Sequence, residues 1–317
     1  MRLWYCDHHQ IPLPAGHKFP TQKYRLLRDA LQHDGRFTFE AAPFAQTSDI
    51  EAAHDPQYVS DFITGVLDPR VIRRIGFPWS EYLVRRTLGS VGGTLAAMRD
   101  ALAVGWGGNL AGGTHHAFRS EGAGFCVFND IAIAILCGFR DGFFERAAVV
   151  DLDVHQGDGT AKIFEEDARV LTLSLHGRDN FPFRKQVSAI DIALPDGTED
   201  VEYLRALADA LPRVFEFGPE IIVYQSGVDG LASDRLGRLQ LTHDGLAARD
   251  RMVFEACARA EVPCVVTLGG GYGDPIDTTV SAHATTFRTA ADLMPQFVNA
   301  RRPSRPCPDA VAAPRDR

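Results

Sequence analysis

The chain has 317 residues, of which 45% are hydrophobic and 23% are charged. This is ordinary globular composition and allows a sizeable core. The formal net charge of −8 disfavours direct binding to nucleic acid, because a phosphate-binding surface needs a basic balance, although an acidic rim can still attract a basic substrate.

Short apolar runs alternate with longer helical segments along the chain. The pattern predicts, in chain order, helices over 81–104 and 129–139, strands over 147–152 and 170–175, a helix over 201–217, a strand over 221–224, a helix over 245–260, a strand over 263–268 and a helix over 275–294. The strands are rich in Val, Ile and Leu without alternation, which is typical of buried parallel strands. We therefore expect a single α/β domain, a doubly wound and mostly parallel sheet flanked by helices.

The ends of the chain and its cysteines indicate the domain bounds and the compartment. We expect the domain over 1–300, and a disordered tail over 301–317, which is rich in Pro, Arg and Ala. The six cysteines form no CxxC pair, so reduced and mostly buried thiols are the simpler interpretation. The first residues carry charge and histidine where a signal peptide needs an apolar run, and no segment has the length of a membrane span. We expect a cytoplasmic protein without a membrane partner.

Polar residues follow each of the four predicted strands. They are Asp151, Asp153 and His155 after the first, His176 after the second, Gln225, Ser226 and Asp229 after the third, and Gly269, Gly270, Gly271 and Tyr272 after the fourth. Ligands of open α/β sheets bind beyond the carboxyl ends of the strands. These distant residues should therefore meet in one cleft.

Two acidic residues and one imidazole in this set suit a metal ion. Asp151, Asp153 and His155 alternate, so an extended chain would place them on one side. With Asp229 as a third ligand beside Asp153 and His155, the site would suit zinc and keep a position open for water, as catalytic sites do. Taken singly, turn carboxylates or an aspartate cap are the commoner roles for such residues.

Two further motifs suit hydrolysis. His115 and His116 follow a glycine pair, and two imidazoles can act as base and acid when carboxylates such as Asp151 and Asp158 hold their second nitrogens. Tyr272 follows three glycines and can donate its hydroxyl to an oxyanion. A satisfied core histidine and a packing tyrosine in a glycine-rich turn are the structural alternatives.

In their order and spacing, these segments resemble the histone deacetylases, which have the arginase–deacetylase fold. The resemblance covers about 8–284 and rests on Gly112-Gly-Thr-His-His116, Gly124-Phe-Cys-Val-Phe-Asn129, Asp151-Leu-Asp-Val-His-Gln-Gly-Asp-Gly159, Ser174-Leu-His176, Gly227-Val-Asp229 and Gly269-Gly-Gly-Tyr272. The stretches Gly16-His-Lys-Phe-Pro20, Lys23-Tyr-Arg-Leu-Leu27 and Ser90-Val-Gly-Gly-Thr94 are similar to the bacterial and class IV branch.

The resemblance implies a set of catalytic roles. Asp153, His155 and Asp229 would bind one catalytic zinc ion (Zn2+). His115, held by Asp151, and His116, held by Asp158, would form the acid–base pair, with the dominant base left open. Tyr272 would donate first to the substrate carbonyl and then to the tetrahedral oxyanion.

The resemblance also implies a substrate channel and a second ion. Phe125 would line a narrow acyl-lysine channel opposite Phe181, or opposite Phe183, because the loop after His176 differs from that of many relatives. The carbonyl of Gly124 would accept from the substrate amide. A structural potassium ion (K+) would be held by Asp151, Ser174 and the backbone carbonyls of Asp153, His155 and Leu175.

The expected activity is hydrolysis of an acyl group from the ε-amine of lysine in a peptide or protein, by a metal-dependent amidohydrolase. The alternative is the same reaction on an acylated small amine such as an acetylpolyamine. A dinuclear manganese ureohydrolase would need additional metal-binding Asp and His residues, and a non-catalytic acyl-lysine binding module would lack a metal ligand or Tyr272. The acyl group stays open.

Overall fold

A computed structural model describes residues 1–294 of the protein, and the expected tail over 301–317 lies outside them. Eight parallel strands form one sheet in the order β2-β1-β3-β8-β7-β4-β5-β6. The strands are β1 (Arg2–Tyr5), β2 (Thr38–Ala41), β3 (Trp106–Asn109), β4 (Ala147–Asp151), β5 (Val170–Gly177), β6 (Ile190–Leu194), β7 (Ile221–Gln225) and β8 (Cys264–Thr267).

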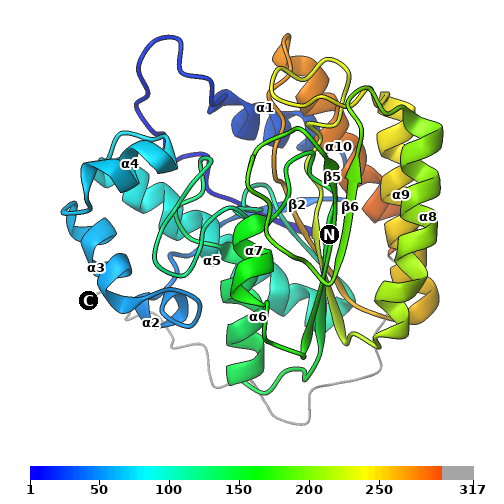
Figure 1. Ribbon diagram of the computed structural model, residues 1–317, viewed down its shortest axis with the longest axis horizontal. Helices are drawn as coiled ribbons and strands as arrows, with labels where there is room; N and C mark the ends of the chain where they lie inside the picture. Colours follow the sequence, from blue (N-terminus) through cyan, green and yellow to red (C-terminus); the bar gives the residue numbers. More distant parts are fainter. Residues whose placement is uncertain (295–317) are drawn as a thin grey trace.

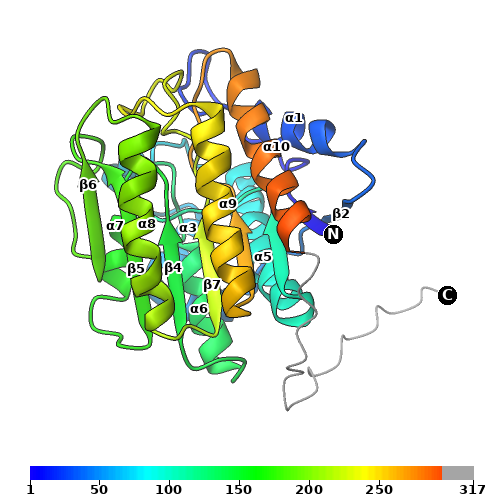
Figure 2. The same ribbon diagram turned by 90° about the vertical axis from the view of Figure 1, so that its right-hand side faces the viewer.

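Helices cover both faces of the sheet (Figures 1 and 2). They are α1 (Gln22–Leu31), α2 (Thr47–Ile50), α3 (Pro56–Thr64), α4 (Pro69–Ile75), α5 (Glu81–Val104), α6 (Asp130–Arg140), α7 (Asp158–Ile163), α8 (Asp200–Glu216), α9 (His243–Ala260) and α10 (Ile276–Leu293). The predicted doubly wound α/β fold is confirmed.

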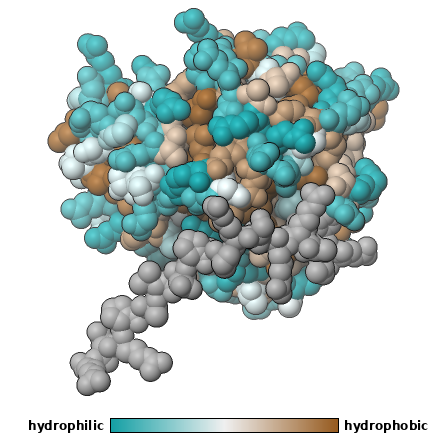
Figure 3. Space-filling view, turned by 90° about the horizontal axis from the view of Figure 1, so that it is seen from below, coloured by the Kyte–Doolittle hydropathy of each residue, from teal (hydrophilic) through white to brown (hydrophobic). Residues whose placement is uncertain are grey.

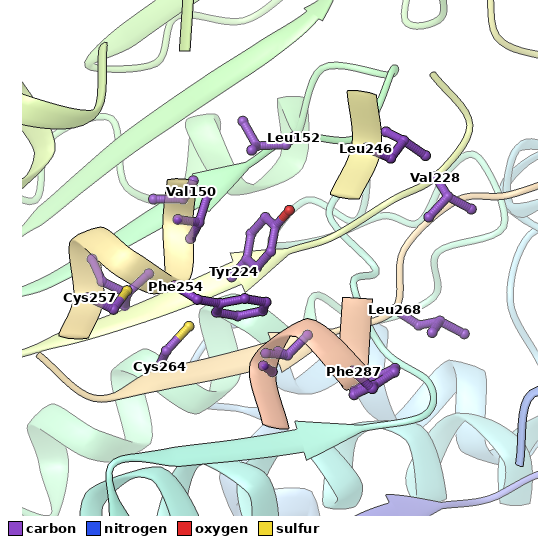
Figure 4. Packing of buried hydrophobic residues seen from close by; sticks show 14 of the residues in the cluster. Val150, Leu152, Tyr224, Val228, Leu246, Phe254, Cys257, Cys264, Leu268 and Phe287 are labelled. Carbon is purple, nitrogen blue, oxygen red and sulfur yellow. The ribbon is translucent and has the colours of Figure 1, made fainter. Parts of the chain in front are cut away.

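Each face of the sheet has its own hydrophobic core. One core joins the sheet to α1, α8, α9 and α10, and the other joins it to α2, α3, α5 and α6. Figure 4 shows part of the first core, where Tyr224 of β7 packs edge-on against Phe254 of α9 with ring centroids 5.6 Å apart. Cores on both faces explain why the strands read as continuous apolar runs.

The sequence prediction located the four central apolar strands and five long helices and missed the remaining elements. The missed strand β3 reads Trp-Gly-Gly-Asn, a weak strand signal because glycine is depleted in strands. A Cβ on Gly107 would lie 1.9 Å from the carbonyl oxygen of Ala97 in α5. Glycine is therefore required there because α5 and β3 lie so close together. This requirement comes from tertiary packing and not from local sequence.

Helix α5 begins and ends where the sequence indicates. The side chain of Ser80 accepts a hydrogen bond from the backbone N–H of Leu83 at the start, and Gly105 ends the helix in the left-handed conformation at φ 92°. The helix lies between the sheet and the outer helices, and most of its residues are buried. It therefore places polar residues such as Ser90 inside the protein.

The polar surface, the helices and the cysteines match what the sequence predicts. Figure 3 shows hydrophilic side chains interspersed with smaller hydrophobic areas on the face seen from below. None of the helices in residues 1–294 is long and apolar enough to cross a membrane. The five cysteines in this part of the chain are free and buried, as predicted.

Candidate active site

The candidate site lies beyond the carboxyl ends of the central strands. Asp151, the last residue of β4, pairs in register with Gln225 at the end of β7 and with Ser174 in β5. Gln225 pairs in turn with Thr267 at the end of β8. The segments that follow these strands therefore start side by side, although more than a hundred residues separate them.

Three potential metal ligands meet at this edge. The donor atoms of Asp153, His155 and Asp229 all lie within 4.8 Å of one another, and all three residues are buried. Nδ1 of His155 lies 3.0 Å from Oδ1 of Asp153 and 3.0 Å from Oδ2 of Asp229. The expectation of an extended chain here was wrong, because β4 ends at Asp151 and the ligands lie in the bend that follows.

Backbone groups hold this bend in place. The backbone N–H of Val154 donates to Oδ1 of Asp229 at 2.9 Å, and the N–H of Gly270 donates to Oδ2 of Asp153 at 2.7 Å. A Cβ on Gly270 would lie 1.8 Å from Oδ2 of Asp229, and one on Gly227 would lie 2.1 Å from Oδ2 of Asp153. Two glycines therefore make room for the carboxylates.

The charges of the three residues fit a cation. Burial and the charge of Asp153 raise the pKa of Asp229. Burial opposes a charged His155, but the two carboxylates outweigh it and raise the pKa of His155 to about 10. Two buried carboxylates and one imidazole in contact suit a divalent ion such as zinc, and three protein ligands leave a coordination position open.

Two histidines lie beside this cluster, each paired with its own carboxylate. Nδ1 of His115 lies 2.6 Å from Oδ2 of Asp151, and Nδ1 of His116 lies 2.6 Å from Oδ1 of Asp158, the first residue of α7. The two rings are stacked at a tilt, with centroids 4.1 Å apart, and both are buried. The carboxylates accept from Nδ1 and so leave each Nε2 for a substrate.

The two imidazoles differ in their affinity for a proton. Burial disfavours a charged His115, but Asp151 and Asp153 outweigh it and raise its pKa to about 9. Burial and the neighbouring His115 lower the pKa of His116 to about 4. Near neutral pH, His115 therefore favours its protonated form and His116 its neutral form.

Tyr272 is buried at the same cavity. Its ring centroid lies 6.4 Å from that of His155 and 6.1 Å from that of Phe125. Sequence reasoning assigned no role to two residues that hold its loop. The buried Lys23 donates to the carbonyl of Gly269 at 3.0 Å, and Oδ2 of Asp234 accepts from the backbone N–H of Tyr272 at 2.6 Å. Lys23 begins a stretch that resembles the bacterial and class IV branch, but no local pattern indicates that either residue holds this loop.

Aromatic residues line the approach to the cluster. The ring of Phe181 meets that of His116 edge-on with centroids 4.9 Å apart, and Phe181 is 37% exposed whereas Phe183 is 85% exposed. Phe125 adopts a left-handed backbone conformation at φ 66°, which is sparsely populated for non-glycine residues. A Cβ on Gly124 would lie 2.7 Å from Cδ2 of His116, so a glycine is needed beside the imidazole.

The residues expected to bind potassium lie at the ends of β4 and β5 and in the bend that follows β4. Asp151 and Ser174 are paired neighbours on β4 and β5, and Leu175 follows Ser174. Oδ1 of Asp151 accepts from the backbone N–H of Asp153 at 3.2 Å. The structure thus brings every predicted site residue to one edge of the sheet.

The fold and these side chains define the class of a metal-dependent amidohydrolase. Residues 17–288 match the model of the histone deacetylase domain. The chain therefore belongs to the histone deacetylase family, and the resemblance noted in the sequence is confirmed. Members of this family are hydrolases that act on amide bonds.

Individual relatives agree with this assignment. An uncharacterized protein of Picosynechococcus is 43% identical over 293 residues, covering 91% of this chain and 98% of that protein. Histone deacetylase 2 of Arabidopsis thaliana is 32% identical over 270 residues, covering 81% and 70%. Human histone deacetylase 1 is 34% identical over 230 residues, and the match covers 66% of this chain and 44% of that protein.

Solved structures show the same fold. A histone deacetylase homologue from Aquifex aeolicus superposes with a TM-score of 0.78 at 24% identity, covering 91% of this chain and 83% of that one. The HD domain of HDA15 superposes with a TM-score of 0.76 at 21% identity, covering 94% of each chain.

Proposed function

We propose that this chain is a zinc-dependent lysine deacylase that removes an acyl group from the ε-amine of lysine in peptides or proteins. One observation carries the proposal: Asp153, His155, His115, His116 and Tyr272 all line a single cavity. Metal ligands, an acid–base pair and an oxyanion donor are the groups that amide hydrolysis needs. The family match supports deacetylase activity in general.

Asp153, His155 and Asp229 would hold the zinc ion. Zinc bound there would lower the pKa of a water molecule toward neutrality and polarise the acyl carbonyl. The adjacent Asp151, Ser174 and the carbonyls of Asp153, His155 and Leu175 would hold a structural potassium ion. Their proximity to one another across β4 and β5 supports that assignment.

The two histidines would divide the proton transfers. His116, whose pKa is lowered to about 4, is neutral near pH 7 and would accept the proton of the attacking water at Nε2. His115, whose pKa is raised to about 9, carries a proton that would stabilise developing negative charge. As the amide C–N bond breaks, the nitrogen gains the proton that His116 took from the water. The products are a carboxylate and a free lysine amine.

The remaining residues would bind and orient the substrate. The Tyr272 hydroxyl would donate to the acyl oxygen, and its position beside His155 supports this role. Phe125 and Phe181 would form the walls of the lysine channel, because Phe181 contacts His116 and is 37% exposed, against 85% for Phe183. The carbonyl of Gly124 would accept from the substrate amide N–H.

A comparison of substrates tests the proposal. The zinc-loaded protein is assayed with acetyl-lysine peptides, with N-acetylated polyamines and with a hydroxamate chelator as inhibitor. Hydrolysis of the peptides, blocked by the hydroxamate, supports a lysine deacylase. Hydrolysis of the polyamines alone would show that the same groups act on a small molecule, and hydrolysis of neither would overturn the assignment.

A further inference from the structure

We propose that Arg86 forms an anion-binding subsite in the acyl cavity, and that the favoured acyl group carries a terminal carboxylate, as in succinyl- or glutaryl-lysine. The inference rests on the proposed deacylase function and names its substrate class. It comes from a buried cation that the catalytic roles described above do not use.

Arg86 is buried in α5 without a carboxylate partner. Its side chain is only 8% exposed, and within residues 1–294 it forms no ion pair. Nη1 donates to Sγ of Cys6 at 2.6 Å, and the guanidinium carbon lies 4.4 Å from the ring centroid of Tyr24. The neighbouring carboxylate of Asp7 is instead paired with Arg28 at 3.0 Å.

A second buried arginine shows how the fold treats such a group elsewhere. Arg249 donates to Oδ1 of Asp250 from both Nε and Nη2, at 2.9 and 2.8 Å, and from Nη1 to the carbonyl of Gly227 at 2.6 Å. A buried guanidinium is costly unless its charge is paired and its five N–H groups find acceptors. Arg86 contacts a thiol and the ring of Tyr24, and the Asp7 carboxylate attracts it only from beyond ion-pair distance, which leaves N–H donors for a ligand.

Arg86 lies in the same cavity as the catalytic groups. Ser90 follows Arg86 by four residues on the same face of α5, about 6 Å along the axis. The Oγ of Ser90 accepts from the backbone N–H of Gly112 at 3.1 Å, and Gly112 begins the loop that carries His115. The histidines, Ser90 and Arg86 therefore line one continuous cavity.

The walls of the cavity around Arg86 suit a short carbon chain. Ile11, Leu83 and Val91 line it with apolar surface, and Thr87 adds a hydroxyl beside Arg86. An acetyl group would leave the Arg86 guanidinium without an anion. A longer neutral acyl chain would contact the apolar walls but would not pair with the guanidinium. A dicarboxylic acyl group does both, since a guanidinium binds a carboxylate through two parallel hydrogen bonds.

The wild-type protein provides the first test. One lysine peptide is prepared with acetyl, butyryl, succinyl, pentanoyl and glutaryl groups, and kcat/KM is measured for each with the zinc-loaded protein. We expect succinyl or glutaryl to exceed its neutral partner of equal chain length by about tenfold or more, as a charge-assisted hydrogen bond allows. Faster hydrolysis of butyryl and pentanoyl would overturn the inference. Failure on every peptide, acetyl included, would instead count against the proposed deacylase function.

Substitutions of two adjacent arginines provide the matched control. Arg86→Met removes the cation at similar volume and should abolish the preference, while Arg86→Lys should keep part of it. Arg85 is exposed on the same helix, so Arg85→Met should keep the wild-type ratio of succinyl to butyryl. If Arg86→Met does not fold, as judged by its melting curve, Arg86→Lys and the wild-type ratio decide. An unchanged ratio in a folded Arg86→Met protein would contradict the subsite.

Binding measurements on a slow variant distinguish binding of the acyl group of the substrate at Arg86 from binding of the released carboxylate there. In a Tyr272→Phe background, which is expected to hydrolyse slowly, the affinities of succinyl- and butyryl-lysine peptides are compared. Tighter binding of the succinyl peptide, lost on adding Arg86→Met, supports the inference. Equal affinities for both peptides would overturn the inference. If Arg86→Met then weakened only the inhibition by free succinate or acetate, the subsite would bind the released carboxylate and not the acyl group of the substrate.

Discussion

Nδ1 of His116 lies 2.6 Å from Oδ1 of Asp158, and both side chains are buried. The carboxylate fixes the orientation of the ring and leaves Nε2 directed toward the cavity. His115 has the same relationship with Asp151, but the additional charge of Asp153 separates the proton affinities of the two rings. Two histidines with the same type of carboxylate partner thus differ in their affinity for a proton.

Removing the neutral imidazole should affect turnover more than metal binding. His116→Ala should lower kcat by about 100-fold or more, because a positioned general base contributes about 10²–10⁴-fold. Steady-state kinetics with an acetyl-lysine peptide give kcat, and metal analysis should still find one zinc per chain. A kcat within a factor of a few of wild type would contradict the role of His116.

Loss of one hydroxyl tests the oxyanion donor. Tyr272→Phe should lower kcat by about 10²–10³-fold, the usual effect of removing one donor to an oxyanion. The ring remains in place, so the melting temperature and the zinc content should match those of the wild type. Full activity of the variant would rule out the proposed hydrogen bond.

Two neighbouring phenylalanines provide a matched pair for the channel wall. Phe181 packs on His116, and Phe183 is 85% exposed. Phe181→Ala should raise KM for the peptide by about five- to tenfold, because partly buried aromatic contact with the substrate is lost. Phe183→Ala should change KM by less than about twofold, as expected of an exposed side chain. The reverse order of effects would identify Phe183 as the wall.

The stability of the protein should fall in mild acid because of His54. This residue is 1% exposed, its Nε2 accepts from the backbone N–H of Asn129 at 2.8 Å, and burial lowers its pKa to about 4. Between about pH 6.5 and pH 4 the unfolded chain binds a proton that the folded chain excludes. The contribution of neutral, buried His54 to the free energy of unfolding is therefore fully present above pH 6.5. It falls by about 3 kcal/mol as the pH decreases from 6.5 to 4.

Denaturant unfolding at several pH values measures this effect. His54→Gln cannot titrate, so the free energy of unfolding of that variant should depend less on pH between 4 and 6.5 than that of the wild type. Equal slopes for the two proteins would show that His54 does not contribute.

The sequence predicted the parts of this fold that depend on local pattern. The apolar runs that became β4, β5, β7 and β8, and the capped helix α5, carry their signals in consecutive residues. The strand β3 carries none, because Gly107 is selected by its distance from Ala97. Local periodicity contains no information about such close approaches between distant elements.

The same distinction applies to the site. Asp153, His155 and Asp229 were predicted because they follow strands whose ends must meet. The roles of Lys23 and Arg86 were not predicted, because a basic residue in a helix is normally exposed and only the tertiary structure buries these two. The different exposure of Phe181 and Phe183 could not be predicted either, because it depends on the path of the loop.

The central claim is that Asp153, His155 and Asp229 hold one divalent ion used for amide hydrolysis. The most direct measurement is the metal content of the purified protein, together with its activity on an acetyl-lysine peptide before and after chelation and zinc resupply. The account predicts one zinc per chain, activity lost with the metal and restored with it, and neither in Asp229→Ala. A protein that binds no divalent ion when resupplied, or that hydrolyses the peptide equally well without one, would contradict it.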